Sequence, residues 1–475
     1  MLRPFFRSHS TPNPSKHWLT TSISALTLGA LLALSISPNM TYAQTPPVPN
    51  AASSNQTQSG PVIDADTIRV GISDNSMKNQ EYPSAQLSAT GAFTIVDQST
   101  GKTIHWGSAW QAVTFKVNKN GFYLSGAGFS RGPFKGPMVM QPKNESDRVK
   151  FLSISRRGAQ PTYKGHFEIA RGFSSPAKLS VINVLPLQEY LKAVVPNELP
   201  ARYGYEAVKA QSVAARNYAI RPREKPWPTF DICDSQYCQV YFGAHTENAT
   251  TNKALQETYG LVALYDGDPI LALYSSAHGG HSESYENAFS DPKTKQFPGT
   301  PLVYLTGAPD IPNTLPQSLQ DAGQLATEEG ARAFWLTQNL TGYDADSPYK
   351  RWEKRWSAAE IQNTINRNLA EAANDKLTRD FISPGFRKGQ SIGTLQHIDV
   401  TRRGISGKAM ELNIVGSNGT WTLKKEFVIR KVFQHGGRML PSANVVFSHM
   451  TGAGGRLVYL KANGGGFGHG VGMSQ

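Results

Sequence analysis

The 475-residue sequence has only two cysteines, and outside one N-terminal segment no apolar run approaches the length needed to cross a membrane. It also lacks zinc-finger spacing, the aromatic signature of RNA-binding domains and any localised block of lysine and arginine. The formal charge is nevertheless +13. A diffuse basic charge favours an anionic polymer such as a cell wall as the partner, and the missing signatures argue against nucleic acid.

Two familiar signatures are present only as fragments. Ser73-Asp74-Asn75 and Ser175-Pro176-Ala177-Lys178 reproduce two elements of the penicillin-binding-protein set, but in the wrong order and without a Lys-Thr-Gly triplet. The stretch Gly464–Gly472 fails as a dinucleotide fingerprint, because a G-x-G-x-x-G begun at Gly466 ends on Val471. We treat both as chance matches and expect Gly464–Gly472 to form a loop whose backbone can close on a ligand.

The N-terminus has the pattern of an export signal. Three basic and no acidic residues lie in the first 43 positions, where an apolar run, Leu19–Ile36, is followed by the small-x-small site Thr41-Tyr42-Ala43. Residues 1–43 are therefore predicted to be a signal peptide, with a retained membrane anchor as the alternative. The mature chain, with a formal charge of +10, is expected in the periplasm or cell wall. Residues 44–60, rich in Pro, Asn, Ser and Gln, predict a flexible linker.

Residues 61–175 contain short runs of alternating apolar and polar residues. Turn signals at Ser99-Thr100-Gly101 and Asn118-Lys119-Asn120-Gly121 separate these runs, which is typical of hairpins. The sequence therefore predicts a small β-rich N-terminal region. Its expected strands include Ile68–Ile72, Phe93–Val96, Thr114–Val117 and Phe122–Leu124.

One carboxylate occupies an unusual position in the stretch Leu185–Ile220. Glu198 lies in the segment Pro196–Pro200, whose two prolines restrict the backbone, so a turn is predicted there. Tyr205–Ile220 follows with helical spacing and several alanines that allow close packing. An ionisable side chain on a rigid turn, backed by a packed helix, has the ingredients of a preorganised acid or base. The alternative is a solvated loop glutamate.

The remaining chain, residues 176–475, is predicted to form a single domain. The fold class expected is α+β, mostly antiparallel β with a central Ala-rich helix, preceded by the small β region. Two surface helices are expected, Ser318–Leu336 and Ala358–Ala372. Strands are expected at Leu179–Val184, in a pair joined at Asp266–Pro269, and at Leu395–Arg402, Met410–Val415, Thr420–Leu423 and Phe427–Arg430.

Further motifs occur in a recognisable order along the chain. They are Cys238-Gln239-Val240-Tyr241, Tyr274-Ser275-Ser276, Gly279-Gly280-His281-Ser282-Glu283-Ser284, Tyr304-Leu305, Ser347-Pro348-Tyr349, Arg403-Gly404-Ile405-Ser406-Gly407, Leu440-Pro441-Ser442-Ala443 and Gly468-His469-Gly470-Val471-Gly472-Met473-Ser474-Gln475. Together with Leu185–Ile220 they resemble the SpoIID/LytB family, the stage II sporulation protein D and amidase-enhancer proteins of bacterial cell-wall remodelling.

The resemblance implies an activity and its partners. In the family, the glutamate matching Glu198 is the essential residue of a lytic transglycosylase, which cleaves the MurNAc–GlcNAc bonds of denuded peptidoglycan without hydrolysis. The alternative is a non-catalytic amidase enhancer or glycan-binding module that stimulates a separate cell-wall amidase. Peptidoglycan glycan strands are the expected partner in both cases, with a cell-wall amidase as a second one and no nucleic acid.

The same resemblance suggests the surroundings of Glu198. Val194, Val195, Leu199 and Tyr203 are expected to provide an apolar surround that raises its pKa, as acid catalysis near neutral pH requires. The candidate substrate-binding residues are Gln211, Arg216, Ser275, Ser276, His281, Glu283 and His469.

The two cysteines admit more than one interpretation. Cys233 and Cys238, in an exported chain with no others, favour a disulfide that closes a short loop. A zinc site with His278 and His281 is an alternative, because some SpoIID-like proteins bind zinc near this loop. Tyr237 stands where a histidine would make that comparison closer. No cofactor is predicted, with zinc as the alternative. For the two cysteines, free thiols are a further alternative to the disulfide.

Family members usually continue past Met-Ser-Gln with a closing helix, which residues 176–475 are expected to lack. Phe467, Val471 and Met473 would then be exposed at a mobile terminus. His469, in the loop that faces the catalytic cleft in the family, would be poorly held.

Overall fold

The computed structural model describes residues 67–221, 227–310, 322–338 and 343–475. The predicted signal peptide (1–43) and linker (44–60) lie outside the described residues. All described residues belong to one compact unit, Pro61–Gln475. Within the described ranges, no helix has the length and apolar character needed to cross a membrane.

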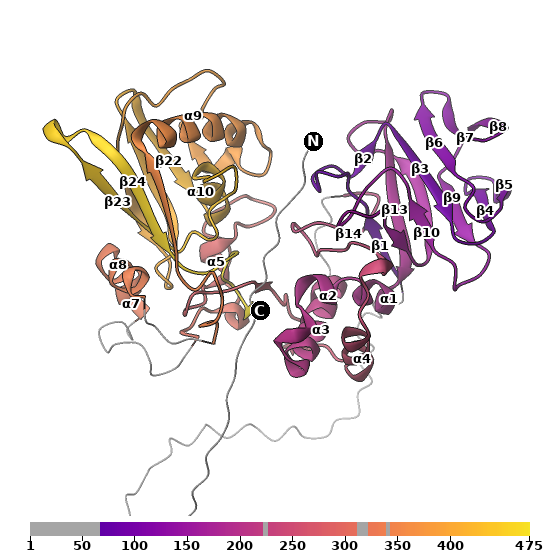
Figure 1. Cartoon of the computed structure of the whole chain (residues 1–475), viewed down its shortest axis with the longest axis horizontal. Coiled ribbons are helices and arrows are strands. Elements are labelled where there is room, and N and C mark those ends of the chain that lie inside the picture. The colour runs from indigo at the N-terminus through magenta and orange to yellow at the C-terminus, as the bar shows by residue number, and fades with distance from the viewer. Residues whose placement is uncertain (1–66, 222–226, 311–321, 339–342) are drawn as a thin grey trace, which may run out of the picture. The chain divides into compact units, whose positions relative to one another are not determined.

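Two sheets form the first part of the described chain (Figure 1). One has the strand order β14-β1-β13-β12-β9-β4-β5 with β2 paired to β13, and the other has the order β11-β10-β3-β6-β7-β8. The strands are β1 (Thr67–Gly71), β2 (Glu81–Tyr82), β3 (Ser84–Ala89), β4 (Phe93–Asp97), β5 (Lys102–Gly107), β6 (Val113–Asn118), β7 (Gly121–Gly126), β8 (Phe129–Phe134), β9 (Met138–Pro142), β10 (Val149–Phe151), β11 (Thr162–Tyr163), β12 (His166–Arg171), β13 (Leu179–Pro186) and β14 (Ile232–Cys233).

The alternating sequence explains how these sheets share a core. On β6, Val113, Phe115 and Val117 are buried while the residues between them are more accessible. These side chains join one hydrophobic cluster with residues of both sheets. The predicted hairpins are confirmed, since β4 pairs with β5 and β6 with β7. The first sheet crosses residue 175, the predicted domain boundary, because β13 pairs with β1 and β12.

Four helices gather at one end of these strands (Figure 1): α1 (Leu187–Lys192), α2 (Val195–Glu198), α3 (Tyr205–Ile220) and α4 (Ala249–Glu257). The helix predicted at Tyr205–Ile220 is confirmed. The segment around Glu198 is a single helical turn, where a plain turn was expected. Pro196 lies in its first turn, where a proline is tolerated, and Leu199 is extended before Pro200.

The middle of the chain is less regular. A hairpin joins β15 (Leu264–Tyr265) and β16 (Asp268–Pro269), as predicted. Next come β17 (Tyr274–Ser275), α5 (Tyr285–Ala288), α7 (Ala322–Leu325) and α8 (Glu328–Leu336). The helix expected at 318–336 begins outside the described residues and is interrupted before α8, whose first turn is capped by the side chain of Thr327.

The last part of the chain contains two further sheets, ordered β19-β22-β21-β20 and β18-β24-β23. Helices α9 and α10 share a hydrophobic core with them. The bounds are β18 (Trp352–Ser357), α9 (Ala358–Asn374), β19 (Ile382–Ser383), β20 (Leu395–Arg403), β21 (Ala409–Gly416), β22 (Gly419–Lys424), α10 (Glu426–Val432), β23 (Val445–Thr451), β24 (Leu457–Gly464) and β25 (Met473–Ser474).

The strand predicted at Phe427–Arg430 is wrong, because these residues belong to α10. Lys425 has φ 76°, which ends β22 and turns the backbone into the helix. Val428, Ile429 and Val432 then point into the core at helical spacing. A run of four residues is too short for its periodicity to separate a strand from a helix.

The predicted exposure of the last residues is wrong for Val471 and Met473. Val471 is 0% exposed and packs in a cluster with Leu273, Ala288 and Leu305. Met473 is partly buried, since β25 pairs in parallel with β17. Phe467 is 37% exposed, as expected.

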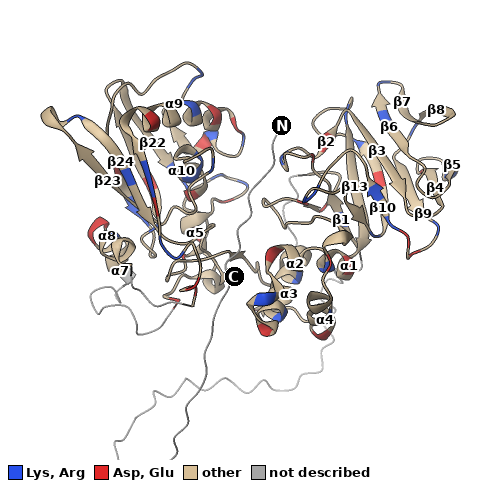
Figure 2. Ribbon diagram, in the orientation of Figure 1, with Lys and Arg blue, Asp and Glu red and all other residues tan. Residues whose placement is uncertain are grey.

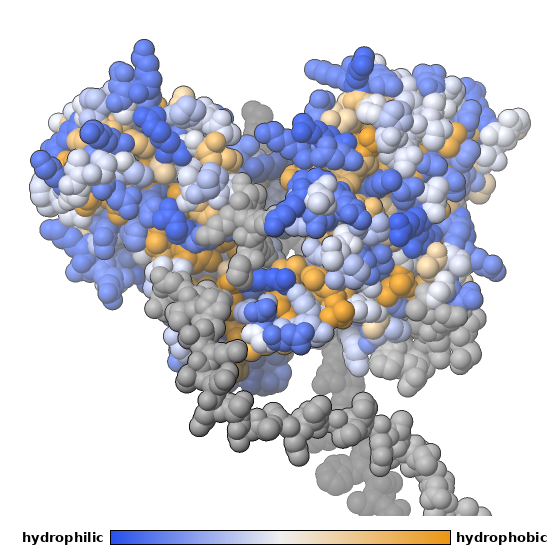
Figure 3. Space-filling model, turned by 180° about the vertical axis from the view of Figure 1, so that it is seen from behind, coloured by the Kyte–Doolittle hydropathy of each residue, from blue (hydrophilic) through white to orange (hydrophobic). Residues whose placement is uncertain are grey.

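Neither the charged nor the hydrophobic residues are concentrated in one region of the described surface. Figure 2 shows lysine and arginine interspersed with acidic residues over helices and strands. On the face in Figure 3, hydrophobic residues form small groups separated by hydrophilic ones. The described surface thus matches the diffuse basic charge expected from the sequence.

Candidate functional site

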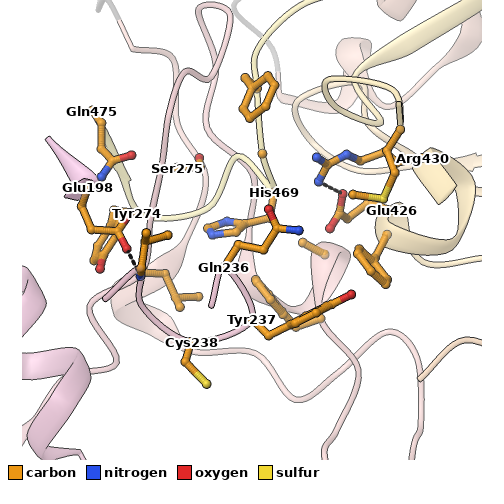
Figure 4. A pocket seen from close by; sticks show the side chains of 18 of the residues that line it. Glu198, Gln236, Tyr237, Cys238, Tyr274, Ser275, Glu426, Arg430, His469 and Gln475 are labelled. Carbon is orange, nitrogen blue, oxygen red and sulfur yellow. Dashed lines mark hydrogen bonds and ion pairs between the residues drawn. The ribbon is translucent and has the colours of Figure 1, made fainter. Parts of the chain in front are cut away.

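A pocket of about 420 Å³ contains Glu198 and is lined by three stretches of the chain. The first runs from α2 to the loop after β14, the second from β17 to α5, and the third from α10 to the final glycine-rich loop. Its volume falls within the range of small-molecule binding sites. Val240 is among the lining residues, as are Glu198, Cys238, Tyr274, Ser275, Glu426, Arg430, His469 and Gln475, which are labelled in Figure 4.

Glu198, the last residue of α2, faces this pocket. The backbone N–H of Val240 donates a 2.6 Å hydrogen bond to its Oε1. Burial raises the pKa of Glu198 to about 7, and hydrogen bonds from Val240 and the Gln475 side chain only partly oppose this effect. The carboxyl group is therefore close to half protonated at neutral pH, which suits a group that must both give and take a proton.

The apolar surround of Glu198 differs in part from the expectation. Val194, Val195 and Leu199 are buried in the main core and do not line the pocket, so their predicted contact with the Glu198 carboxyl stays a prediction. Tyr203 is 53% exposed and does not line the pocket. Tyr274 does line it, and burial together with the nearby Glu198 raises the pKa of its phenol.

A buried polar network supports the same wall of the pocket. Gln239 Nε2 donates to Tyr274 Oη at 3.0 Å and to the carbonyl of Ala215 at 3.2 Å. Tyr190 Oη donates to Gln239 Oε1 at 3.2 Å. Gln239 and Tyr274 were not among the predicted site residues. Both belong to the sequence motifs that carry the family resemblance, and those motifs could have identified them as site residues.

His469, in the final glycine-rich loop, lies between Glu198 and Arg430 in the view of Figure 4, and Ser275, on β17, also lines the pocket. The N–H of Val471 donates to Nδ1 of His469 at 3.1 Å, and burial lowers the pKa of this histidine to about 3. The imidazole is therefore neutral, with its proton on Nε2. Ser275 Oγ accepts a 3.1 Å hydrogen bond from Gly470 N–H, which fixes the loop against β17. The expectation that His469 would be poorly held is therefore wrong.

Gln211 and Arg216 lie on the buried side of α3 and do not line the pocket. Gln211 reaches it indirectly, because Gln475 Nε2 donates to Gln211 Oε1 at 3.1 Å. Arg216 donates to the carbonyl of Leu261 at 2.9 Å. Ser276 is exposed and also lies outside the pocket lining.

Glu283 and His281 are held in a separate buried junction. The carboxylate of Glu283 accepts hydrogen bonds from the backbone N–H of Ser284, Ile405 and Ser406, from the Ser406 hydroxyl and from the side chain of Asn287. His281 Nδ1 lies 2.6 Å from its neighbour's carbonyl, Ser282 O. Neither lines the pocket, so their predicted role in sugar binding stays a prediction.

Cys233 and Cys238 are joined by a disulfide, and Cys238 lines the pocket. Their sulfur atoms are therefore not thiolate ligands. Nδ1 of His278 contacts Asp310 at 3.2 Å. In the described ranges no group of three or more His, Cys, Asp or Glu residues could hold a metal ion. The residues of the alternative zinc site are thus not placed as ligands.

Two regions of the chain match known protein families, and several known proteins are similar to it. Residues 175–265 match the model of the SpoIID family, described as stage II sporulation protein, and residues 292–472 match a domain of unknown function. The amidase enhancer of Bacillus subtilis (strain 168) is 28% identical over 285 residues, covering 60% of this chain and 36% of that protein. Stage II sporulation protein D of Bacillus amyloliquefaciens is 31% identical over 147 residues, 27% of this chain and 42% of that protein.

The chain thus spans well under two thirds of these curated relatives. Residues 175–265 thus form a SpoIID-family domain, and the named relatives are an amidase enhancer and stage II sporulation proteins D. Glu198, Val240 and the disulfide lie within the SpoIID-matched segment, whereas Glu426, Arg430 and His469 lie in the domain of unknown function. Both matched regions therefore contribute residues to one pocket.

Proposed function

We propose that this protein is an exported lytic transglycosylase that cleaves the MurNAc–GlcNAc bonds of denuded peptidoglycan, with Glu198 as its general acid and base. The observation that carries the proposal is the pKa of Glu198, raised to about 7 by burial in a pocket that a sugar can enter. The resemblance to the SpoIID/LytB family supplies the substrate class. The N-terminal signal pattern supports export.

In the proposed reaction, protonated Glu198 gives its proton to the glycosidic oxygen as the bond to muramic C1 breaks. The resulting carboxylate is stabilised by the N–H of Val240. It then takes the proton of the muramoyl 6-hydroxyl, whose oxygen bonds to C1 and closes the 1,6-anhydro ring. Glu198 is protonated again at the end, so one residue serves both steps.

The charge arrangement of the pocket supports this reaction over hydrolysis. Hydrolytic glycosidases use a second carboxylate as base or nucleophile. The other carboxylate in the pocket lining, Glu426, is engaged by Arg430, whose Nη1 lies 3.1 Å from Oε2. It is therefore not a free base for hydrolysis.

A non-catalytic amidase enhancer is the second candidate, and the name of the Bacillus subtilis relative favours it. Digestion of sacculi stripped of stem peptides separates the two. An enzyme releases fragments ending in 1,6-anhydromuramic acid, detectable by mass spectrometry, and the Glu198→Gln variant serves as the control. An enhancer releases none alone but accelerates a cell-wall amidase added to intact sacculi.

A further inference from the structure

The pocket also contains a charged pair, Glu426 and Arg430, to which no role in binding has been assigned. Glu426 and Arg430 lie on the opposite side of His469 from Glu198 (Figure 4). Both line the pocket although they are only 4% and 8% exposed. They occupy positions i and i+4 of α10, whose apolar face is anchored in the core by Val428, Ile429 and Val432.

The hydrogen-bonding capacity of this pair is only partly used. Arg430 donates through Nε to the Leu440 carbonyl at 3.0 Å and through Nη1 to Glu426 Oε2 at 3.1 Å. Its Nη2, and Oε1 of Glu426, have no hydrogen-bond partner among the described residues. Because both residues line the pocket, these two atoms can form hydrogen bonds with a ligand there.

The chemistry of the two unused atoms defines what they can bind. Nη2 is a donor and Oε1 an acceptor, so together they complement a group with one carbonyl oxygen and one N–H. A secondary amide has this pattern. A lone carboxylate fits less well, because it would meet the Glu426 charge. Tyr237 and Phe427, whose rings pack edge to face with centroids 6.2 Å apart, add an apolar wall suited to a methyl group.

We infer that Glu426 and Arg430 form a subsite for the acetamido group of an N-acetyl sugar in the glycan bound across Glu198. The subsite rests on the proposed glycan binding and deepens it, since it makes N-acetylation a requirement at a position remote from the cleaved bond. It lies in the matched domain of unknown function, and it gives that domain a role in substrate selection.

The test measures binding in the Glu198→Gln background, where cleavage does not interfere. Chitotetraose carries an acetamido group on every ring, and cellotetraose has the same β-1,4 backbone with hydroxyls instead. We expect chitotetraose to bind at least about tenfold more tightly, as hydrogen bonds to charged groups imply. Equal affinities for the two oligosaccharides overturn the inference without any further variant.

The double variant Glu426→Leu/Arg430→Met then localises the preference. Replacement of a buried ion pair by apolar residues of similar size is often tolerated, and an unchanged melting temperature verifies this. We expect the preference for chitotetraose to disappear. In the control Glu411→Leu/Lys424→Met, which removes an ion pair outside the pocket, the preference should persist.

Two results contradict the inference. One is a preference for chitotetraose that survives the double variant. The other is loss, in the double variant, of binding to a denuded fragment with a free lactyl carboxylate while chitotetraose binds as before, which identifies an anion site instead. Failure of the proposed function appears separately, as the absence of anhydro products from the unsubstituted protein.

Discussion

Two glutamates that the family resemblance marked as functional, Glu198 and Glu283, have opposite surroundings. Glu198 accepts a backbone hydrogen bond from Val240, contacts Gln475 and faces the pocket. Glu283 accepts five hydrogen bonds in a junction between the turn at 281–284 and the turn at 404–406. A carboxylate has about four lone-pair sites, so contacts within the protein already use the accepting capacity of Glu283.

Residues from one set of family motifs can therefore either face the pocket or hold parts of the fold together. Gly404 illustrates the second role, because a Cβ at this position would lie 2.2 Å from Glu283 Oε2. A glycine is thus required for the backbone to reach the carboxylate. The number of satisfied hydrogen bonds, rather than the motif, distinguishes the carboxylate that faces the pocket from the one held in the junction.

The largest expected effect is on catalysis by Glu198. Glu198→Gln removes the proton donor at almost constant volume, so release of anhydro-muropeptides should fall by at least about 10²- to 10⁴-fold. Folding should be intact, since the carboxylate accepts few hydrogen bonds. Product release from denuded sacculi, followed by mass spectrometry, measures the effect. Activity equal to that of the parent protein would show that Glu198 is not the acid.

Glu283→Gln should instead lower the stability of the fold. It replaces an acceptor of five hydrogen bonds by a group whose NH₂ faces other donors, which should lower the free energy of unfolding by about 3 kcal/mol or more. Urea denaturation measures this loss, and Glu329→Gln at an exposed position of α8 is the matched control. A Glu283→Gln protein that is fully stable but unable to bind glycan would instead support the predicted sugar contact.

Because the pKa of Glu198 is raised, both the stability and the rate should depend on pH. The folded pKa of about 7 exceeds the ordinary value of 4.5, so between these pH values the folded state holds a proton that the unfolded state has lost. Stability should therefore fall as pH rises from 4.5 to 7, by roughly 3 kcal/mol in total, and then level off. The rate should fall above pH 7 as the acid ionises.

Glu198→Gln provides the control for both curves. Its unfolding free energy should lose this pH-dependent component, and above pH 7 it should be more stable than the parent protein. Parallel stability curves for the two proteins would show that Glu198 titrates near its ordinary pKa when folded.

How much of this could be predicted from the sequence depends on the range of the interaction. Local patterns predicted the hairpins of the N-terminal region and the helix Tyr205–Ile220, because alternation and helical spacing are properties of adjacent residues. The family motifs indicated Glu198. The strand expected at Phe427–Arg430 failed because the backbone change at Lys425 and the packing of α10 are tertiary effects.

The missing parts of the site are long-range contacts. Val240 follows Glu198 by 42 residues, and Gly470 follows Ser275 by 195. No periodicity relates such positions. Burial of Val471 likewise follows from packing against Leu273 and its neighbours, and the lowered pKa of His469 follows from its own burial. The glycine-dense terminal sequence reveals neither.

The smallest expected effect concerns the loop that holds Val240 against Glu198. The disulfide between Cys233 and Cys238 closes this loop just before Val240, and in chain-entropy terms a loop so short contributes about 2 kcal/mol. Cys233→Ser/Cys238→Ser should lower the unfolding free energy by about that amount. It should also move the alkaline limb of the pH–rate profile to higher pH, because a less firmly held Val240 N–H lowers the pKa of Glu198 less than before.

Thiol titration of the parent protein, with two thiols found only after reduction, verifies the pairing. An unchanged alkaline limb in the double variant would show that the rest of the buried wall, rather than the disulfide, holds Val240 in place.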